Sequence, residues 1–518
     1  MPKAPIAIGI DLGTTFSVVA YLDSTGRPCT ITNAEGDLIT PSVVLLDGGS
    51  SVVGKEAVKA AAMEPDKIAD FAKRDMGRMF YSKKVSGEQL PPEVIQSLIL
   101  EKLRKDAELK LGPIEKAVVT VPAFFNEPRR KATQDAAQLA GLQILDIINE
   151  PTAAAIAFGY QVGFLDDKGE AAQKETVLVY DLGGGTFDVT VMEIQGRDFT
   201  ALATGGDVFL GGIDWDRRLA DHIGAKFRDK HHGFDPRQDA AGNQKLLKEA
   251  EDAKRALSAR EQVTVTFEHV GQGIRLPITR TEFEEMTADL LERTRFTVKS
   301  VLREANLKWS DITRLLLVGG SSRMPRVQTM LEEESGLKVD RSLSPDEAVA
   351  HGAALYAGFL LAREEVPADG APPKKPAMQV RNVSSHDLGV LSKDPATGRP
   401  MNSVIIPRNT VLPATKGKRF RTAKQGQKTV AINVIEGGDS AGRNATPIGR
   451  CTIHGLPPDL PAGVTVEVIF TYGENGRLKV EGRLPELRRK ALLSIERASG
   501  LDDEKLNEWG QKLKAARK

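Results

Sequence analysis

Val177 to Thr190, VLVYDLGGGTFDVT, is the segment that decides how this chain folds. Its first four residues are apolar and predict a buried strand. They run directly into Asp181, three glycines, a threonine and a second acid, Asp188. Because glycine has no side chain, a turn built from it lets backbone N–H groups come close to a ligand such as phosphate. The segment therefore predicts a strand that ends in a phosphate-binding loop.

Two further segments follow the same pattern. Residues 6–17 read IAIGIDLGTTFS, and residues 315–323 read LLLVGGSSR. Asp11 and Asp181 stand at the mouths of the first two turns, and hydroxyl residues follow the glycines. A single turn of this kind could be an ordinary strand end, and that remains the alternative interpretation. The repetition favours two similar α/β lobes that hold a nucleotide between them.

The two aspartates predict a metal ion. Carboxylates that face a phosphate chain repel it unless a divalent cation lies between them. Mg²⁺ that retains several of its waters is the usual solution. We therefore expect Asp11 and Asp181 to hold Mg²⁺ through water.

Longer stretches of the chain resemble the 70-kDa heat-shock chaperone family, within the actin and sugar-kinase ATPase superfamily. The similar motifs are IDLGTTFS, VTVPAFFNEPRRKAT, IINEPTAAAIAFG, DLGGGTFD, GGIDWDRRL, EAEDAKRALS, LLLVGGSSRMPRVQ and SPDEAVAHGAA. They cover essentially all of residues 5–360. The resemblance implies an ATP-dependent molecular chaperone that binds and hydrolyses ATP and holds unfolded or extended polypeptide segments.

The resemblance also implies the catalytic residues. Lys73 would point at the γ-phosphate and the attacking water, where a fixed ammonium stabilises the transferring phosphoryl group. From the residues alone, Lys73 would be a solvated lysine. Glu150 would orient the water or hold the metal shell. Asp181, Thr186 and Asp188 would complete the group, although Asp188 has the alternative of hydrogen bonding to its own loop.

The nucleotide-binding residues follow from the same motifs. In EAEDAKRALS, four polar residues fall at i, i+3, i+4 and i+7 and share one helix face, which from the residues alone could be a solvated face of ion pairs. Arg255 would stack on the base with Arg323 on its other side. Asp346 fits both a first-turn helix acid and the adenosine side of the site. The full set is Asp11, Gly13, Thr14, Thr15, Phe16, Gly183, Gly184, Gly185, Thr186, Glu251, Lys254, Arg255, Ser258, Gly319, Gly320, Ser321, Arg323 and Asp346.

The expected fold class is α/β, with a two-lobed actin-like ATPase domain over residues 1–363. A linker at 364–379, a β-sandwich peptide-binding domain at 380–484 and a short helical tail at 485–518 follow. Pro122 and Arg130 match residues that relay nucleotide state to the second domain, although a strand-ending role would explain Pro122 equally well. In the family the linker is apolar with an acid, whereas residues 378–382 here read MQVRN. This difference puts coupling between the domains in doubt.

Short β-type runs at residues 403–407, 429–436, 450–454, 464–472 and 477–481, separated by turn residues, predict the β-sandwich. Met401, Val404, Phe420 and Val430 match positions near the family's peptide groove, or they are core residues. Lys416, Lys418, Arg419 and Arg421 surround Phe420, so the groove would favour clients with acidic flanks. The tail, LSIERASGLDDEKLNEW, resembles the start of the family's lid. We expect the lid to be truncated and bound peptide to leave quickly.

Composition limits the partners. The chain has 71 lysines and arginines against 70 aspartates and glutamates, which gives no general case for nucleic-acid or membrane binding. Two distant cysteines, Cys29 and Cys451, predict neither a disulfide framework nor a metal site. With no secretory signal or membrane span in view, a cytoplasmic protein is expected. The expected partners are unfolded polypeptides, a nucleotide-exchange factor and a J-domain co-chaperone, which Asp146 would repel.

Three other functions were weighed. A nucleotide-gated module for one dedicated partner, with weak turnover, is the main alternative, because the linker and lid differ from the family's. A small-molecule kinase would leave the C-terminal β-domain unexplained. An actin-like filament would be obstructed by that domain.

Overall fold

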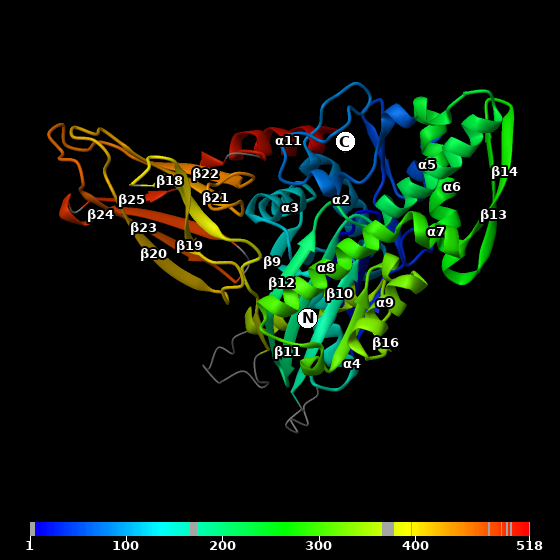
Figure 1. The fold of residues 1–518 in the computed structure, drawn as a ribbon, viewed down its shortest axis with the longest axis horizontal. Helices are drawn as coiled ribbons and strands as arrows, with labels where there is room; N and C mark the ends of the chain where they lie inside the picture. Colours follow the sequence, from blue (N-terminus) through cyan, green and yellow to red (C-terminus); the bar gives the residue numbers. More distant parts are fainter. Residues whose placement is uncertain are drawn as a thin grey trace.

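The computed structural model describes residues 6–165, 174–364, 378–394, 396–474, 477–487, 489–493, 496–497 and 500–516. Two α/β lobes form one body, and a β-sandwich projects from it (Figure 1). Among the described helices, none has the length and apolar character needed to cross a membrane.

The first lobe is built on a six-stranded sheet. Its strand order is β3-β2-β1-β8-β9, and β4 pairs with β2 beside this path. The buried segment that ends at Asp11 is the central strand β1, which pairs with β2 antiparallel and with β8 parallel. The elements of this lobe are β1 (Ala7–Asp11), β2 (Phe16–Leu22), β3 (Pro28–Thr30), β4 (Thr40–Pro41), β5 (Val44–Asp47), β6 (Ser50–Val53), α1 (Lys55–Ala60), β7 (Ile68–Ala69), α2 (Pro92–Leu111), β8 (Lys116–Val121), α3 (Glu127–Leu139) and β9 (Gln143–Asn149).

The second lobe repeats this plan around the segment 177–190. Its sheet has the order β16-β15-β10-β11-β12-β17, with β10 antiparallel to β11 and parallel to β15. The outer part consists of helices and a long hairpin, β13–β14 (Figure 1). The elements are β10 (Glu175–Leu182), β11 (Phe187–Gln195), β12 (Asp198–Asp207), α5 (Gly212–Lys230), α6 (Ala240–Ala259), β13 (Gln262–His269), β14 (Gln272–Thr279), α7 (Arg280–Met286), α8 (Ala288–Glu304), β15 (Arg314–Val318), α9 (Pro325–Ser335), β16 (Val339–Asp340) and β17 (Gln379–Arg381).

Two helices join the lobes. α4 (Glu150–Gln161) and α10 (Ala348–Glu364) pack against each other, α10 against β1 and α4 against β10. A Cβ on Gly352 would lie 1.8 Å from the Ala153 carbonyl oxygen, so glycine is required for the close approach of the two helices. Their shared apolar cluster, which includes Ile156 and Phe158, belongs to both lobes.

The C-terminal domain is a β-sandwich, as predicted. One sheet has the order β19-β18-β21-β22-β26 and the other β20-β23-β24-β25. The sequence analysis missed β18 and β20. β20 reads ATKGKRFR and lacks apolar alternation because it is a largely exposed edge strand. The strands are β18 (Leu388–Lys393), β19 (Pro400–Ile406), β20 (Ala414–Arg421), β21 (Val430–Glu436), β22 (Thr446–Ile453), β23 (Thr465–Tyr472), β24 (Leu478–Leu484), β25 (Arg489–Leu493) and β26 (Glu496–Arg497).

The prediction of a helical tail over 485–518 is wrong in its first half. β25 adds to β24 and β26 adds to β22, so residues up to 497 complete the two sheets. Only α11 (Asp503–Ala516) is the expected helix. It lies along α2 and α3 of the first lobe, where Leu506 packs against Val94 and Leu139 (Figure 1).

The expected linker lies mainly outside the described residues, which resume at Met378. From Met378 onward the chain is not a free linker. Met378 is buried, and β17 pairs in parallel with β12, aligning Gln379 with Asp198. The segment MQVRN thus docks on the ATPase body although its apolar run is broken.

Candidate nucleotide site

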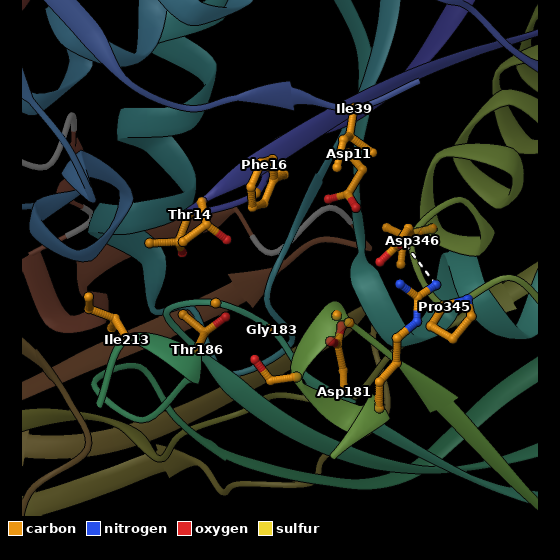
Figure 2. A pocket seen from close by; sticks show the side chains of 18 of the residues that line it. Asp11, Thr14, Phe16, Ile39, Asp181, Gly183, Thr186, Ile213, Pro345 and Asp346 are labelled. Carbon is orange, nitrogen blue, oxygen red and sulfur yellow. Dashed lines mark ion pairs between the residues drawn. The ribbon is translucent and has the colours of Figure 1, made fainter. Parts of the chain in front are cut away.

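A cavity of about 400 Å³ lies between the lobes, a volume suited to a small ligand. Figure 2 shows Asp11, Thr14 and Phe16 from the first lobe facing Asp181, Gly183 and Thr186 from the second. Of the residues predicted to bind nucleotide, Gly185 alone is absent from its lining, and the predicted catalytic residues Lys73 and Glu150 line it too. The sequence motifs therefore converge on one place.

The two glycine turns touch each other across the cleft. A Cβ on Gly184 would lie 2.1 Å from Thr15 Oγ1, and one on Gly185 would lie 2.3 Å from Thr14 Cγ2. Real Cβ contacts are never this short, so glycine is required in the second loop by the first loop. Gly185 serves this packing contact and does not line the cavity.

Three carboxylates, Asp11, Glu150 and Asp181, line the cavity, and a fourth, Asp188, lies opposite Asp181 outside the lining. Burial, and then the charge of Glu150, raises the pKa of Asp11 to about 7 and that of Asp188 to about 8. The pKa of Asp181 is also raised well above its usual range, first by burial and then by Glu150 and Asp188. Lys73 Nζ lies 2.6 Å from Glu150 Oε1, and both side chains are buried. One lysine thus faces four acids, an excess of negative charge that a bound cation would relieve.

Lys73 is held in place by the backbone around it. It lies in a short 3₁₀ turn, Ala72–Asp75, that follows a left-handed residue, Phe71. The next residue, Arg74, donates from Nε to the Gly185 carbonyl oxygen at 2.9 Å and pairs with Asp214. The turn that carries Lys73 is therefore bonded to the opposite lobe, which the sequence analysis did not predict.

Asp188 does not line the cavity. It lies opposite Asp181 in the β10–β11 ladder, and its Oδ1 accepts the Phe124 N–H at 3.0 Å. Its hydrogen bond is thus made to the loop after β8 and not, as the alternative predicted, to its own loop. Its charge still acts on Asp181.

The outer part of the cavity holds the residues predicted for the nucleoside. The Arg255 guanidinium lies 5.1 Å from the Phe16 ring centre and pairs with Glu251. Arg323 pairs with Asp346 at 2.7 Å, the contact drawn as a dashed line in Figure 2. The four polar residues of EAEDAKRALS all line the cavity. The helix face that they share therefore borders the candidate site and also carries ion pairs.

Several lining residues escaped the sequence analysis. Asp216 pairs with Lys254 at 2.7 Å and so fixes a predicted nucleotide residue. The sequence feature that could have identified Asp216 is its position two residues after Asp214 in the motif GGIDWDRRL. The others are apolar and come from separate elements and loops, including β2, α5 and α10, so they gave no local signal: Val18, Ile39, Ile213, Met324, Pro345 and Val349.

Arg130 links the acid cluster to the loop that follows Pro122. Its guanidinium donates to the Phe125 and Ala123 carbonyl oxygens and, at 2.7 Å, to Asn149 Oδ1. Asn149 directly precedes Glu150, so one side chain joins this loop to the start of α4.

The same loop contacts the β-sandwich. The Phe124 ring centre lies 4.2 Å from that of His386. The Arg408 guanidinium lies over the Phe124 ring, 5.7 Å from its centre. The Glu127 N–H donates to Glu436 at 2.9 Å, and Arg408 pairs with Glu304 at 3.0 Å. The sandwich is thus docked on both lobes.

The remaining predicted residues lie in the sandwich and at β9. Met401, Val404 and Phe420 are partly exposed, whereas Val430 is buried in the sandwich core. Asp146 is only partly exposed, and its Oδ2 accepts the Tyr356 hydroxyl at 2.9 Å. Burial raises the pKa of Asp146.

Comparison with known proteins agrees with this arrangement. A family model described as Hsp70 protein matches residues 7–89 and 81–517. Chaperone protein DnaK of Thermus thermophilus is 38% identical over 531 residues, covering 96% of this chain and 82% of the relative. Chaperone protein DnaK of Halobacterium salinarum is 38% identical over 516 residues, covering 98% and 78%. The chain belongs to the Hsp70 family of ATP-dependent molecular chaperones.

Proposed function

We propose that ATP binds in the cavity with Mg²⁺, that water is directed at the γ-phosphate there, and that the outcome changes how the β-sandwich holds extended polypeptide. The observation that carries this is the convergence of two facing glycine loops, buried acids from both lobes and one buried lysine on a single cavity. The metal and the lysine would offset the negative charge of the acids and of the triphosphate.

The acid cluster fits a magnesium ion. Buried carboxylates with raised pKa values are groups whose charged form lacks a compensating cation. Among the described residues, no three acidic, histidine or cysteine side chains are close enough to enclose a metal by themselves. Asp11 and Asp181 would hold Mg²⁺ through its waters, and the ion would supply neutralisation of the phosphate charge.

Each polar group then has a role in hydrolysis. The Lys73 ammonium stabilises charge on the transferring phosphoryl group, and Glu150, bonded to it, orients the attacking water. Thr186 supplies a hydroxyl beside the γ-phosphate. Asp188 acts as a positioning residue, because it accepts a hydrogen bond from the Phe124 N–H and lies opposite Asp181 in the β10–β11 pair. Positioning and charge stabilisation carry most of the rate gain.

Coupling to the β-sandwich follows two routes. One runs from Asn149 through Arg130 to the loop that touches His386. The other runs from Thr152, two residues after Glu150, whose hydroxyl donates to the Asn382 side chain at 2.9 Å next to β17. These contacts favour a coupled chaperone over a nucleotide-gated module for one partner. A J-domain co-chaperone and a nucleotide-exchange factor remain proposed partners.

Steady-state ATP hydrolysis with and without an unfolded polypeptide tests this proposal. A carboxymethylated, permanently unfolded protein should stimulate hydrolysis in the full chain. An Arg130→Ala variant should keep basal hydrolysis and lose the stimulation. A rate that ignores unfolded polypeptide in the wild-type chain would contradict coupling and support the gated module.

A further inference from the structure

The end of the β-sandwich that lies away from the ATPase body carries a set of converging loops. Residues 394–399 join β18 to β19, and residues 422–429 join β20 to β21. Because β18 and β21 are antiparallel, the end of β18 and the start of β21 lie at the same end of the sandwich, and so do these two loops. The residues that contact the ATPase body, such as Arg408 and Glu436, lie at the other end of the same strands. The loop end therefore points away from the body (Figure 1).

Apolar side chains are available at this end. Met401 is partly exposed at the start of β19. Phe420, near the end of β20, pairs with Val466 and packs against the sandwich core, yet it is also only partly buried. β19 and β20 are the edge strands of the two sheets and lie next to each other, with Lys418 Nζ donating to the Val404 carbonyl oxygen at 3.5 Å. An edge strand can pair with an additional extended segment where its outer backbone groups are free.

Positive charge surrounds these apolar residues. Six basic side chains at this end are exposed: Lys393, Arg399, Arg419, Arg421, Lys424 and Lys428. Four acids share the region. Asp394 is occupied by the backbone N–H groups of residues 396 and 397, and Glu467 lies 3.5 Å from Arg419. Glu486 accepts the Thr465 N–H at 3.4 Å, and Asp459 is exposed.

Most of this positive charge has no internal partner. In the part of the sandwich that the structure describes, Lys424 and Lys428 form no ion pair. Residues 381–484 contain 15 lysines and arginines against 8 aspartates and glutamates, a formal charge of +7, whereas the whole chain carries +1. The rest of the molecule is therefore net negative, and the positive charge belongs to this domain.

We propose that this end of the sandwich selects extended polypeptide segments whose apolar centre is flanked by aspartate or glutamate. The inference rests on the proposed function, in which the sandwich holds extended polypeptide, and it names the chemical class of the preferred client. The apolar centre contacts Met401 and Phe420, while acidic flanks meet the lysines and arginines of the two loops. Such complementarity acts mainly on partner choice and association rate, and salt weakens it.

Binding of three fluorescent peptides to the full chain tests the inference. The peptides share one apolar centre, flanked on both sides by glutamates, glutamines or lysines, and binding is followed by fluorescence anisotropy. At low salt the glutamate-flanked peptide should bind about tenfold more tightly than the glutamine-flanked one, with the lysine-flanked peptide weakest, and high salt should reduce the difference.

A charge variant localises the effect. Lys424→Gln with Lys428→Gln should remove most of the preference for glutamate flanks and leave binding of the glutamine-flanked peptide unchanged. The matched control, Arg450→Gln with Lys479→Gln, removes the same charge from exposed strand positions outside the two loops and should keep the preference.

Two results would overturn the inference. One is equal binding of the glutamate- and glutamine-flanked peptides. The other is displacement of the glutamate-flanked peptide by a single-stranded oligonucleotide that itself binds more tightly, which would assign the surface to nucleic acid. If the glutamine-flanked peptide also fails to bind, the proposed holding of polypeptide fails, and this is distinguishable from loss of the charge preference alone.

Discussion

Removal of Lys73 has two consequences that the structure allows to be estimated. Its ion pair with Glu150 has side chains that are 4% and 8% exposed, with Nζ and Oε1 2.6 Å apart. Exposed pairs contribute about 0–1 kcal/mol, but loss of one partner from a buried pair costs about 3–5 kcal/mol because the other charge stays buried and unpaired. Lys73→Met should therefore lower the free energy of unfolding of the nucleotide-free chain by about 3–5 kcal/mol.

The second consequence is catalytic. The same substitution removes a fixed charge from the position where charge develops on the phosphoryl group, and loss of one such group typically costs about 10²–10³-fold in rate, or about 2.7–4 kcal/mol. Single-turnover hydrolysis at saturating ATP measures this step separately from product release. ADP affinity, measured by titration, should change far less, because in the proposed mechanism Lys73 acts on the γ-phosphate, which ADP lacks.

Two controls separate these effects. Lys73→Met combined with Glu150→Gln should recover most of the lost stability but none of the lost rate, since it removes the unpaired charge without restoring the ammonium. Lys84→Met, at an exposed lysine of the same lobe, should leave both quantities unchanged. Single-turnover hydrolysis by Lys73→Met within about threefold of the wild-type rate would refute the assigned role.

Three further predictions follow from particular contacts. The raised pKa values of Asp11 and Asp188, about 7 and about 8, mean that the folded chain binds more protons than the unfolded chain between about pH 4 and pH 8. Each of these two carboxyls should therefore lower the stability of the nucleotide-free protein by up to about 1.4 kcal/mol per pH unit as the pH rises through this window; urea titrations at several pH values measure this, and Asp188→Asn should flatten the dependence. Gly184→Ala should weaken ADP binding at least about tenfold by displacing the first loop, since its Cβ would lie 2.1 Å from Thr15 Oγ1. Calorimetric titration gives the affinity, and an unaltered value would show that the loops do not touch. Val380→Asp places a charge in β17 beside β12 and should abolish the stimulation of hydrolysis by unfolded polypeptide while basal hydrolysis persists. Retained stimulation would show that coupling does not require the docking of this strand.

Much of the site could be predicted because its chemistry is local in sequence. Each glycine loop directly follows its strand, so VLVYDLGGGTFDVT and IAIGIDLGTTFS contain both the scaffold and the contact groups. What the sequence did not reveal depends on neighbours far along the chain. Gly185 is required by Thr14, and Asp188 is drawn out of the cavity by the Phe124 N–H.

The fold shows the same division. Buried strands with apolar runs were predicted, whereas β20 and β25 were missed because edge or charged strands lack the apolar alternation that identifies a strand. Docking of β17 was missed for a different reason. The MQVRN segment departs from the family's apolar linker, yet three backbone pairings with β12 and the burial of Met378 still attach it.

The central claim is that acids from both lobes hold a magnesium-bound nucleotide between two glycine loops. Calorimetric titration of the full chain with ADP, in the presence of magnesium and in the presence of EDTA, tests it most directly. We predict that magnesium strengthens binding, and that Asp11→Asn in one lobe and Asp181→Asn in the other each remove most of this gain. Equal ADP affinity with and without magnesium, or a gain that survives either substitution, would contradict the account.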